Sequence, residues 1–362
     1  MGGSVKLFEV AGTSVRIHPT FFLLLAWIAA IHWMKGGPQE AVAGVVFIAI
    51  LFLCVVLHEF GHIFMARRFG IKTPDVTLLP IGGVAALERM PEKPGEEIAV
   101  ALAGPAVNLV IAALLIAIAG LPTDAEALVR AAEGEASLVQ RVAVANIALF
   151  AFNLIPAFPM DGGRVLRALL AIPMGFTRAT RAAAVVGQGL AIVLGFLGLF
   201  GNPFLILIAV FIFFAASGEA GYVLARDLTR GYLAAHAMIT RFEALSPLDT
   251  IDDAADLLLR TTQQELPVVD GGGRLRGVLI RADIVRALRE QGGATPVVEV
   301  MTRDIVEVRE TAPLDGVMAE IAKQRSGIVG VVDGAGRLTG YVSSENLYEL
   351  MSIREARALQ GR

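Results

Sequence analysis

The stretch His58-Glu59-Phe60-Gly61-His62 lies inside an apolar run, residues 41–65, that is long enough to cross a bilayer. On a helix, residues four positions apart share one face, so His58 and His62 can both present a ring nitrogen to one metal ion. Glu59 then lies beside the metal, where its carboxylate can act on a water molecule. Ionisable groups within a membrane span are costly and usually functional. The stretch therefore predicts a zinc site with a neighbouring general base at membrane depth, and the alternative is a polar cluster held only by packing.

The composition agrees with a membrane location. Hydrophobic residues make up 55% of the 362 residues and charged residues only 18%, which is far from an ordinary soluble domain. The formal net charge of −3 gives no indication of nucleic-acid binding, so we expect no nucleic-acid partner. Cys54 is the single cysteine and excludes a disulfide within the chain; we interpret it as a small apolar residue rather than a metal ligand.

Six segments have the length and apolarity of membrane spans, which predicts a multi-pass α-helical membrane protein with six transmembrane helices. They are residues 18–36, 43–67, 98–121, 138–156, 181–200 and 203–225. The basic residues that flank them all fall on one side of the membrane, whereas segment 122–137 on the other side is mostly acidic. By the positive-inside rule both termini are then cytosolic. Glu59 lies eight residues before Arg67, so at 1.5 Å per residue it is roughly 12 Å from the cytosolic boundary.

A third metal ligand is available in the segment 153–163. Pro156 and Pro159 cannot continue a helix, so the fourth apolar segment must break at the depth of the two histidines. Asp161, just after the break, can complete a His-His-Asp site with a fourth position left open for water, as catalytic zinc requires. The alternative is that Asp161 only caps a following helix over residues 162–170. The presence of the two histidines favours the ligand.

These pieces resemble the site-2 protease family of intramembrane metalloproteases, in particular the branch with C-terminal CBS domains. One departure is Met160, where the family usually has leucine before the Asp-Gly pair, and an apolar exchange should not disturb a metal. The resemblance covers most of residues 15–230. The matching pieces are His58-Glu59-Phe60-Gly61-His62, Ile81-Gly82-Gly83-Val84, Ala103-Gly104-Pro105 with Asn108, and Asn153 through Asp161-Gly162-Gly163-Arg164.

The resemblance implies one Zn²⁺ per chain, held by His58, His62 and Asp161, with Glu59 catalytic. It also implies that Asn153 holds the substrate backbone or stabilises the oxyanion; packing between helices is the alternative for this residue. It suggests an accessory role for His18, for which an ordinary interfacial histidine is an equal alternative. In the family, the segment corresponding to 69–97 forms a strand-like element near the cleft, whose edge could bind an unwound substrate.

The C-terminal part contains an internal repeat. Met238, the segment 267–271 and Gly277 recur at Met301, at 330–334 and at Gly340, always with the same shift along the chain. Two copies of a β-α-β-β-α unit follow, and they resemble a tandem CBS pair. We therefore predict a membrane protease domain over 1–230 and two α/β CBS domains over 237–290 and 298–352.

CBS pairs commonly bind adenine nucleotides such as ATP or AMP, through a Ser or Thr followed three residues later by Asp. The second copy keeps this pattern as Ser343 and Asn346, whereas the first has Ile280 ahead of Asp283. We expect one competent nucleotide site rather than two. A purely structural pair that dimerises the chain is the alternative, and a homodimer through the CBS domains is expected in either case.

The whole pattern predicts a protease of the plasma membrane, of prokaryotic origin, that cleaves a transmembrane protein substrate within the bilayer at a cytosol-facing site. A metal transporter or channel regulated by its CBS pair is the alternative of another class. Transport requires polar residues along a path to the far side, whereas the intramembrane polar groups here collect near the cytosolic end. A pseudoprotease is disfavoured because Glu59 is present together with all three ligands.

Overall fold

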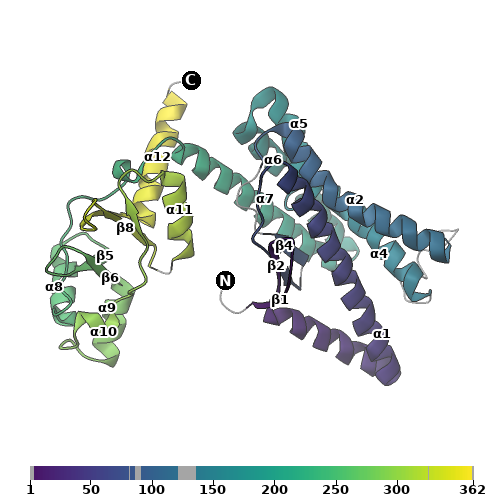
Figure 1. Ribbon diagram of the computed structural model, residues 1–362, viewed down its shortest axis with the longest axis horizontal. Helices are drawn as coiled ribbons and strands as arrows, with labels where there is room; N and C mark the ends of the chain where they lie inside the picture. The colour runs from purple at the N-terminus through teal and green to yellow at the C-terminus, as the bar shows by residue number, and fades with distance from the viewer. Residues whose placement is uncertain (1–3, 81, 86–90, 121–135, 325, 361–362) are drawn as a thin grey trace. The chain divides into compact units, whose positions relative to one another are not determined.

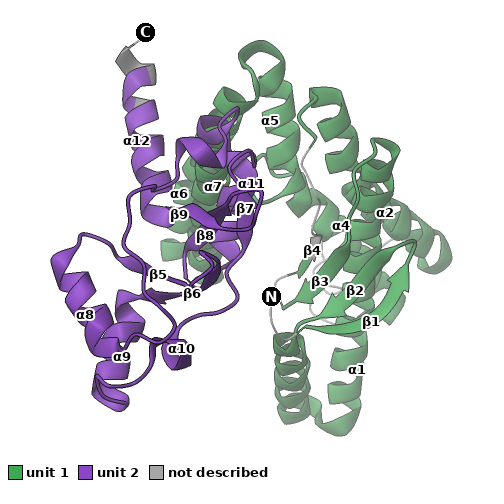
Figure 2. Cartoon of the chain, turned by 60° about the vertical axis from the view of Figure 1, so that its left-hand side comes forward, with its two compact units in different colours: residues 1–223 green, residues 224–362 purple. Residues whose placement is uncertain are grey.

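The computed structural model describes residues 4–80, 82–85, 91–120, 136–324 and 326–360. The chain divides into two units, Met1–Val223 and Leu224–Arg362, which Figure 2 shows in green and purple. Ile81 and most of segment 122–137, which was expected to face outward, lie outside the described residues. The domain limits predicted from the sequence remain predictions.

Apolar helices make up most of the first unit. Four helices of the described residues are long and apolar enough to cross a membrane: α1 (Pro19–Arg68), α2 (Pro94–Ala119), α6 (Phe176–Phe200) and α7 (Phe204–Thr229). A fifth apolar helix, α4 (Leu138–Asn153), has 16 residues, fewer than the ~20 that usually span a bilayer. The coarse prediction of a helical membrane unit is confirmed, and the count of six spans is not.

α1 contains the first two predicted spans. Its backbone is non-helical at Gly36 and Gly37, Gly37 has a φ of 76°, and Pro38 follows. Glycine adopts a positive φ without steric cost, so these two residues allow the chain to change direction. Figure 1 shows the two arms of α1 running in different directions.

A non-helical segment, residues 154–160, separates α4 from α5 (Asp161–Met174), which confirms the break expected from Pro156 and Pro159. Two glycines let α5 begin directly against this segment. A Cβ on Gly162 would lie 2.3 Å from the Leu154 carbonyl oxygen, and one on Gly163 would lie 2.5 Å from the Ala157 carbonyl carbon. Larger residues at these positions would push the start of α5 away.

A four-stranded sheet accompanies the helices, in the order β1-β2-β3-β4. β1 (Val5–Val10) pairs antiparallel with β2 (Thr13–Ile17), β2 parallel with β3 (Asp75–Leu79), and β3 antiparallel with β4 (Gly82–Ala85). The strand-like element expected in 69–97 is therefore confirmed, whereas β1 and β2 were not predicted. Buried side chains of β2 and β3 pack on α1 through Phe21, Phe52 and Phe60.

The second unit holds two small sheets, each covered by helices. The second repeat has the expected β-α-β-β-α order, while in the first a single parallel bridge between Leu245 and Val268 takes the place of the first strand. The elements are η1 (Ala234–His236), α8 (Ile251–Arg260), β5 (Glu265–Val269), β6 (Leu275–Ile280), α9 (Arg281–Glu290), α10 (Val297–Val300), β7 (Glu307–Arg309), α11 (Leu314–Lys323), β8 (Ile328–Val332), β9 (Leu338–Ser343) and α12 (Ser344–Gln360).

The two repeats exchange their first residues. Ile239, before the first repeat's helix, bridges Tyr341 in β9 of the second, and Thr302 of the second bridges Val278 in β6 of the first. A Cβ on Gly340 would lie 2.6 Å from the Ile239 carbonyl oxygen, and one on Gly277 would lie 2.6 Å from that of Thr302. The glycines repeated in the sequence are therefore the points where one repeat's backbone lies on the other's strand.

Gly340→Ala should destabilise the second unit by about 1–3 kcal/mol, because the added methyl group overlaps a backbone carbonyl. The measurement is the thermal unfolding temperature of the purified chain. Gly334→Ala is the matched control, since a Cβ there meets nothing within 4 Å. Equal unfolding temperatures for the two variants would contradict the close contact between repeats.

Candidate metal centre

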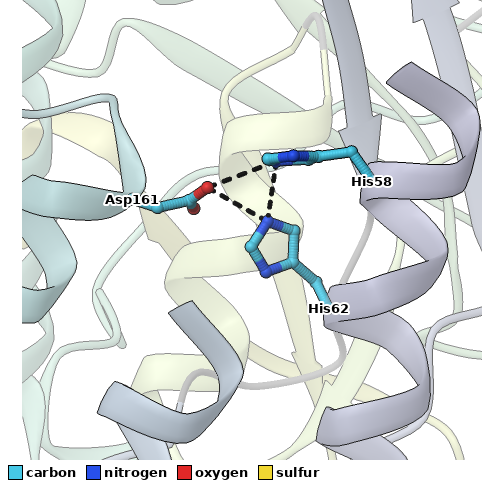
Figure 3. Close-up of side chains that lie close together, drawn as sticks. All are labelled: His58, His62 and Asp161. Atoms are coloured by element: carbon cyan, nitrogen blue, oxygen red, sulfur yellow. Dashed lines mark hydrogen bonds and ion pairs between the residues drawn. The ribbon is translucent and has the colours of Figure 1, made fainter. Parts of the chain in front are cut away.

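Three side chains from two helices converge at one point, as Figure 3 shows. His58 and His62 lie one turn apart on α1, and Asp161 is the first residue of α5. The two Nε2 atoms are 3.1 Å apart, and Asp161 Oδ2 lies 3.3 Å from that of His58 and 3.2 Å from that of His62. All three side chains are buried. The ligand set predicted from the sequence is thus brought together.

The hydrogen-bond partner of Nδ1 in each histidine ring determines which ring nitrogen carries the hydrogen. His58 Nδ1 contacts the side-chain oxygen of Asn108, and His62 Nδ1 lies 2.7 Å from the carbonyl oxygen of Val100. Both partners can only accept, so each Nδ1 donates a hydrogen bond. In neutral rings each Nε2 then has a free lone pair directed away from the partner, as a metal ligand requires.

A second asparagine orients the first. Asn108 Nδ2 donates to Asn146 Oδ1 at 2.9 Å, and Asn146 Nδ2 donates to the Val142 carbonyl oxygen at 2.9 Å. Because this chain of amides ends on a backbone carbonyl, the order of donors and acceptors is set along its whole length. Asn108 therefore presents its oxygen, not its NH₂ group, to His58.

The donor set fits a zinc ion. Two nitrogen lone pairs and a carboxylate oxygen face one another, and Asp161 Oδ2 is buried without a hydrogen-bond partner among the described residues. Three such atoms repel one another unless a cation lies between them. In a tetrahedral site with ligand distances of about 2.0–2.1 Å, neighbouring donors lie roughly 3.3 Å apart. The observed separations of 3.1–3.3 Å agree with that value.

Glycines on both helices allow this approach. A Cβ on Gly104 of α2 would lie 2.2 Å from His62 Nε2 and 2.7 Å from His58 Nε2. A Cβ on Gly61 of α1 would lie 2.6 Å from the Ala103 carbonyl oxygen. Gly61 therefore permits α1 and α2 to cross closely, and Gly104 leaves free the space in front of the two ring nitrogens.

His58, His62 and Asp161 line a cavity of about 410 Å³ that Glu59 and Asn153 also line. Glu59 lies against β4, since a Cβ on Gly83 would be 2.7 Å from its Cγ. Asn153 Nδ2 donates to the Leu149 carbonyl oxygen at 3.0 Å, which occupies one of its two amide hydrogens. Both predicted catalytic residues are thus at the cavity. Its lining is Val55, His58, Glu59, His62, Gly82, Gly83, Asn108, Leu149, Phe152, Asn153, Pro159, Met160, Asp161, Arg164 and Phe211.

His18 is placed elsewhere. It precedes α1 as its N-cap, accepts from the Thr20 backbone N–H at 3.3 Å, and is not among the residues that line the cavity. Its local contacts are those of a helix cap. The accessory role suggested for it remains a prediction.

The residues proposed for nucleotide binding lie in the second unit. Ser343 Oγ donates to Asn346 Oδ1 at 2.8 Å and accepts from the Asn346 backbone N–H at 3.2 Å, so these two lie together at the start of α12. Asp283 instead forms a 2.5 Å ion pair with Arg286 on α9. Burial raises the pKa of Glu265, and the nearby charge of Glu345 raises it further. Glu345 directly precedes Asn346, so a carboxyl-bearing residue is adjacent in sequence to the proposed site.

Sequence reasoning missed three contributors to the metal centre. Val100 acts through its carbonyl oxygen, for which the sequence carries no signal. Gly104 is part of the Ala103-Gly104-Pro105 motif, but the motif does not indicate that this glycine faces the histidines. Asn146 is the one polar residue in the run 142–152, and that signal could have identified it.

Comparisons with known proteins match both parts of the chain. The model of peptidase family M50 matches residues 46–135 and 125–197, and the CBS domain model matches 234–290 and 297–353. A zinc metalloprotease of Methanocaldococcus jannaschii is 31% identical over 98% of this chain and 98% of its own length. A putative zinc metalloprotease of Synechocystis is 27% identical over 98% of this chain and 97% of its own. The solved site-2 protease from Methanocaldococcus jannaschii is 35% identical, covers 60% of this chain and 95% of its own, and superposes with a TM-score of 0.46.

Gly104→Ala should reduce the zinc content of the purified chain to roughly a tenth or less, because the methyl group takes the space in front of both Nε2 atoms. Alanine favours a helix over glycine by up to about 1 kcal/mol, so a loss cannot come from the helix itself. Gly95→Ala on the same helix is the control, since a Cβ there meets nothing within 4 Å. Elemental analysis measures the zinc content of both variants. One zinc ion per chain in Gly104→Ala would rule out the centre as described.

Proposed function

Because the chain belongs to peptidase family M50 and is a zinc metalloprotease with a CBS pair, we propose that it cleaves a membrane-protein substrate in or near a transmembrane helix, from the cytosolic side. The observation that carries this proposal is the convergence of His58, His62 and Asp161 on a cavity that Glu59 also lines. A hydrolytic metal site needs these parts together. The helices that supply them are apolar enough to lie in a bilayer.

The division of labour follows from the residues at the cavity. Zinc, when bound by the two histidines and Asp161, supplies Lewis-acid activation of water and of the scissile carbonyl. Glu59 accepts the proton of the attacking water and delivers it to the leaving amine. Asn153 has an amide hydrogen not used by Leu149, and that hydrogen can donate to the carbonyl oxygen as negative charge develops there.

The substrate must present an extended backbone. A helical peptide bond is shielded by its own hydrogen bonds, so the segment around the cut has to unwind first. β4 is the last strand of the sheet among the described residues and lies against Glu59 through Gly83. An unwound substrate strand can pair with that edge and pass the catalytic carboxylate.

We further propose a plasma-membrane location with six spans and both termini in the cytosol. The two arms of α1 supply two spans, and α2, α4, α6 and α7 supply the others. Support comes from the basic residues that flank these helices and from the relatives, which are prokaryotic. A helix of 16 residues such as α4 would span only with local thinning of the bilayer or a cavity at its end.

For the CBS pair we propose one adenine nucleotide per chain, bound through Ser343 and Asn346, that regulates cleavage. Asp283 is engaged by Arg286, and Ile280 lacks the hydroxyl, which supports a single site. Regulation requires that the nucleotide bind two conformations of the protein with different affinity. The same pair is proposed to join two chains as a homodimer.

Glu59→Gln should retain zinc but lower cleavage by at least about 100-fold, because the amide cannot accept a proton, whereas Asp161→Ala should lose both zinc and cleavage. The assay is cleavage of tagged membrane proteins co-expressed with the chain, with metal analysis of each variant. Glu40→Gln, an exposed glutamate on the same helix, is the control. An active Glu59→Gln variant would remove this residue from the mechanism, and stoichiometric zinc in Asp161→Ala would reassign the third ligand.

The proposed topology predicts opposite labelling at the two ends of α2. In a Cys54→Ala background, Ser137→Cys should react with an impermeant thiol reagent on intact cells, and Lys93→Cys and Ala335→Cys should be protected. Ser137 lies near the C-terminal end of α2, since Gln140 of the next helix reaches the Ala119 carbonyl oxygen at 3.4 Å. Permeabilised cells, in which all three should react, are the control. The inverse pattern on intact cells would reverse the orientation.

Asn346→Ala should weaken nucleotide binding by roughly tenfold, as expected for a lost hydrogen bond to a polar ligand, while Ile280→Ala should leave it nearly unchanged. Calorimetry on the purified chain with ATP and AMP, each with and without Mg²⁺, measures this. Cleavage assays over the same concentrations test the regulation. Absence of binding would leave the pair as a dimerisation module, and binding without a change in cleavage rate would refute the regulatory part.

A further inference from the structure

A buried arginine lies close to the metal centre but takes no part in the chemistry described above. Arg167 is 0% exposed and is the largest fully buried side chain among the described residues. It lies on α5, six residues after Asp161, which is about 9 Å along the helix axis. A guanidinium keeps its charge in proteins, so burial of this kind is stable only with charged partners.

Two carboxylates from two other helices meet this guanidinium. Glu97 Oε1, on α2, lies 2.7 Å from Arg167 Nε and 2.5 Å from Nη2. Glu219 Oε1, on α7, lies 2.5 Å from Nη1. The guanidinium carbon is also 5.1 Å from the centre of the Phe158 ring and 4.7 Å from that of Phe176. Contacts along its edge and over its faces leave the group with one position.

Glu97 lies on the same face of α2 as the residues that contact His58 and His62. Glu97, Val100, Gly104 and Asn108 follow one another at intervals of three or four residues, so they lie along one side of the helix. Val100 and Asn108 accept the two histidine Nδ1 hydrogens, and Gly104 faces both Nε2 atoms. The Arg167–Glu97 pair therefore ties α5 to the same helix face that orients the other two ligands.

No cap at the start of α5 holds Asp161. The N-cap is Met160, which makes no side-chain hydrogen bond to the helix, and Asp161 follows directly after the non-helical segment. Gly162 and Gly163 seat the first turn against that segment. Rotation or sliding of α5 is opposed further along the helix by Arg167, whose partners lie on α2 and α7.

We propose that Arg167, Glu97 and Glu219 form an ion-pair clamp that positions Asp161 relative to the two histidines, with Arg167 and Glu97 as positioning residues of the zinc site. A shift of α5 along α2 would move the Asp161 oxygen away from the two Nε2 atoms while leaving all three ligands intact. The clamp rests on the proposed role of Asp161 as a ligand. Glu219 extends it to α7, and its removal should have a smaller effect because it bonds only one Nη atom.

The test separates positioning from ordinary stabilisation. Zinc affinity is measured by competition with a fluorescent chelator, and thermal unfolding is followed with and without zinc. Glu97→Gln should bind zinc roughly tenfold more weakly, and its zinc-dependent rise in unfolding temperature should shrink accordingly. Arg167→Met should lose at least as much. Arg167→Lys should recover part of the affinity, because it keeps the charge without the fork geometry.

Glu96→Gln is the matched control, because Glu96 is the neighbouring residue and pairs at 3.0 Å with the exposed Lys93. The zinc affinity of this variant should equal that of the unaltered chain. In the double variant Arg167→Met/Glu97→Gln the losses should not add, since both remove one interaction. If Arg167→Met does not fold, the zinc affinities of Glu97→Gln and Arg167→Lys still test whether the ion pair positions Asp161.

Zinc affinities within twofold of that of the unaltered chain in both Glu97→Gln and Arg167→Lys would overturn the clamp. A fall in the unfolding temperature of these variants that is equal with and without zinc would also overturn it, because the ion pair would then only stabilise the fold. Failure of the proposed function would look different. In that case the unaltered chain would gain no stability from zinc, or Asp161→Ala would bind zinc as the unaltered chain does.

Discussion

The close approach of α1, α2 and α5 is the constraint on which the metal centre depends. Three lone-pair atoms can meet at 3.1–3.3 Å only if the helices that carry them pack without intervening side chains. Two glycines permit this at the contact of α1 with α2, Gly61 against the Ala103 carbonyl and Gly104 in front of the histidines, and Gly162 lets α5 begin against the segment that precedes it. Small residues at helix crossings serve the same purpose in membrane proteins generally.

The polar groups buried in this packing are stabilised by hydrogen bonds and ion pairs. The two histidine Nδ1 atoms have oxygen acceptors on α2, and Asn108 is held by Asn146 in turn. Arg167 has two carboxylates and two aromatic rings. In a low-dielectric environment an unpaired member of these networks would be costly, so each network also limits the helices to one arrangement.

The second unit obeys a different principle, the exchange of backbone segments between two copies of one motif. Each repeat's first residues bridge the other's last strand, at Tyr341 and Val278, next to a glycine. Each sheet therefore has a residue of the other copy bridged to one of its strands, which joins the two copies into a pair. α7 crosses the limit between the units, since it runs from Phe204 to Thr229.

The features that depend on local geometry could be predicted from the amino-acid sequence. The four-residue spacing of His58 and His62, the helix break at Pro156 and Pro159, and the repeat of glycines and methionines each follow from backbone periodicity or from residue chemistry, and the structure has the corresponding elements. Asp161 could be proposed as the third ligand because its segment breaks at the same depth as the histidines.

Contacts between groups far apart in the sequence are known only from the folded structure. The Val100 carbonyl, the Asn108–Asn146 relay and the Arg167 ion pairs join residues 38 to 70 positions apart, and no local pattern encodes such contacts. β1 and β2 were not predicted because two short strands before a long apolar helix have little periodic signal of their own. They are stabilised by the pairing of β2 with β3. Local propensity can select an element, but the register between helices comes from packing, which depends on all of them at once.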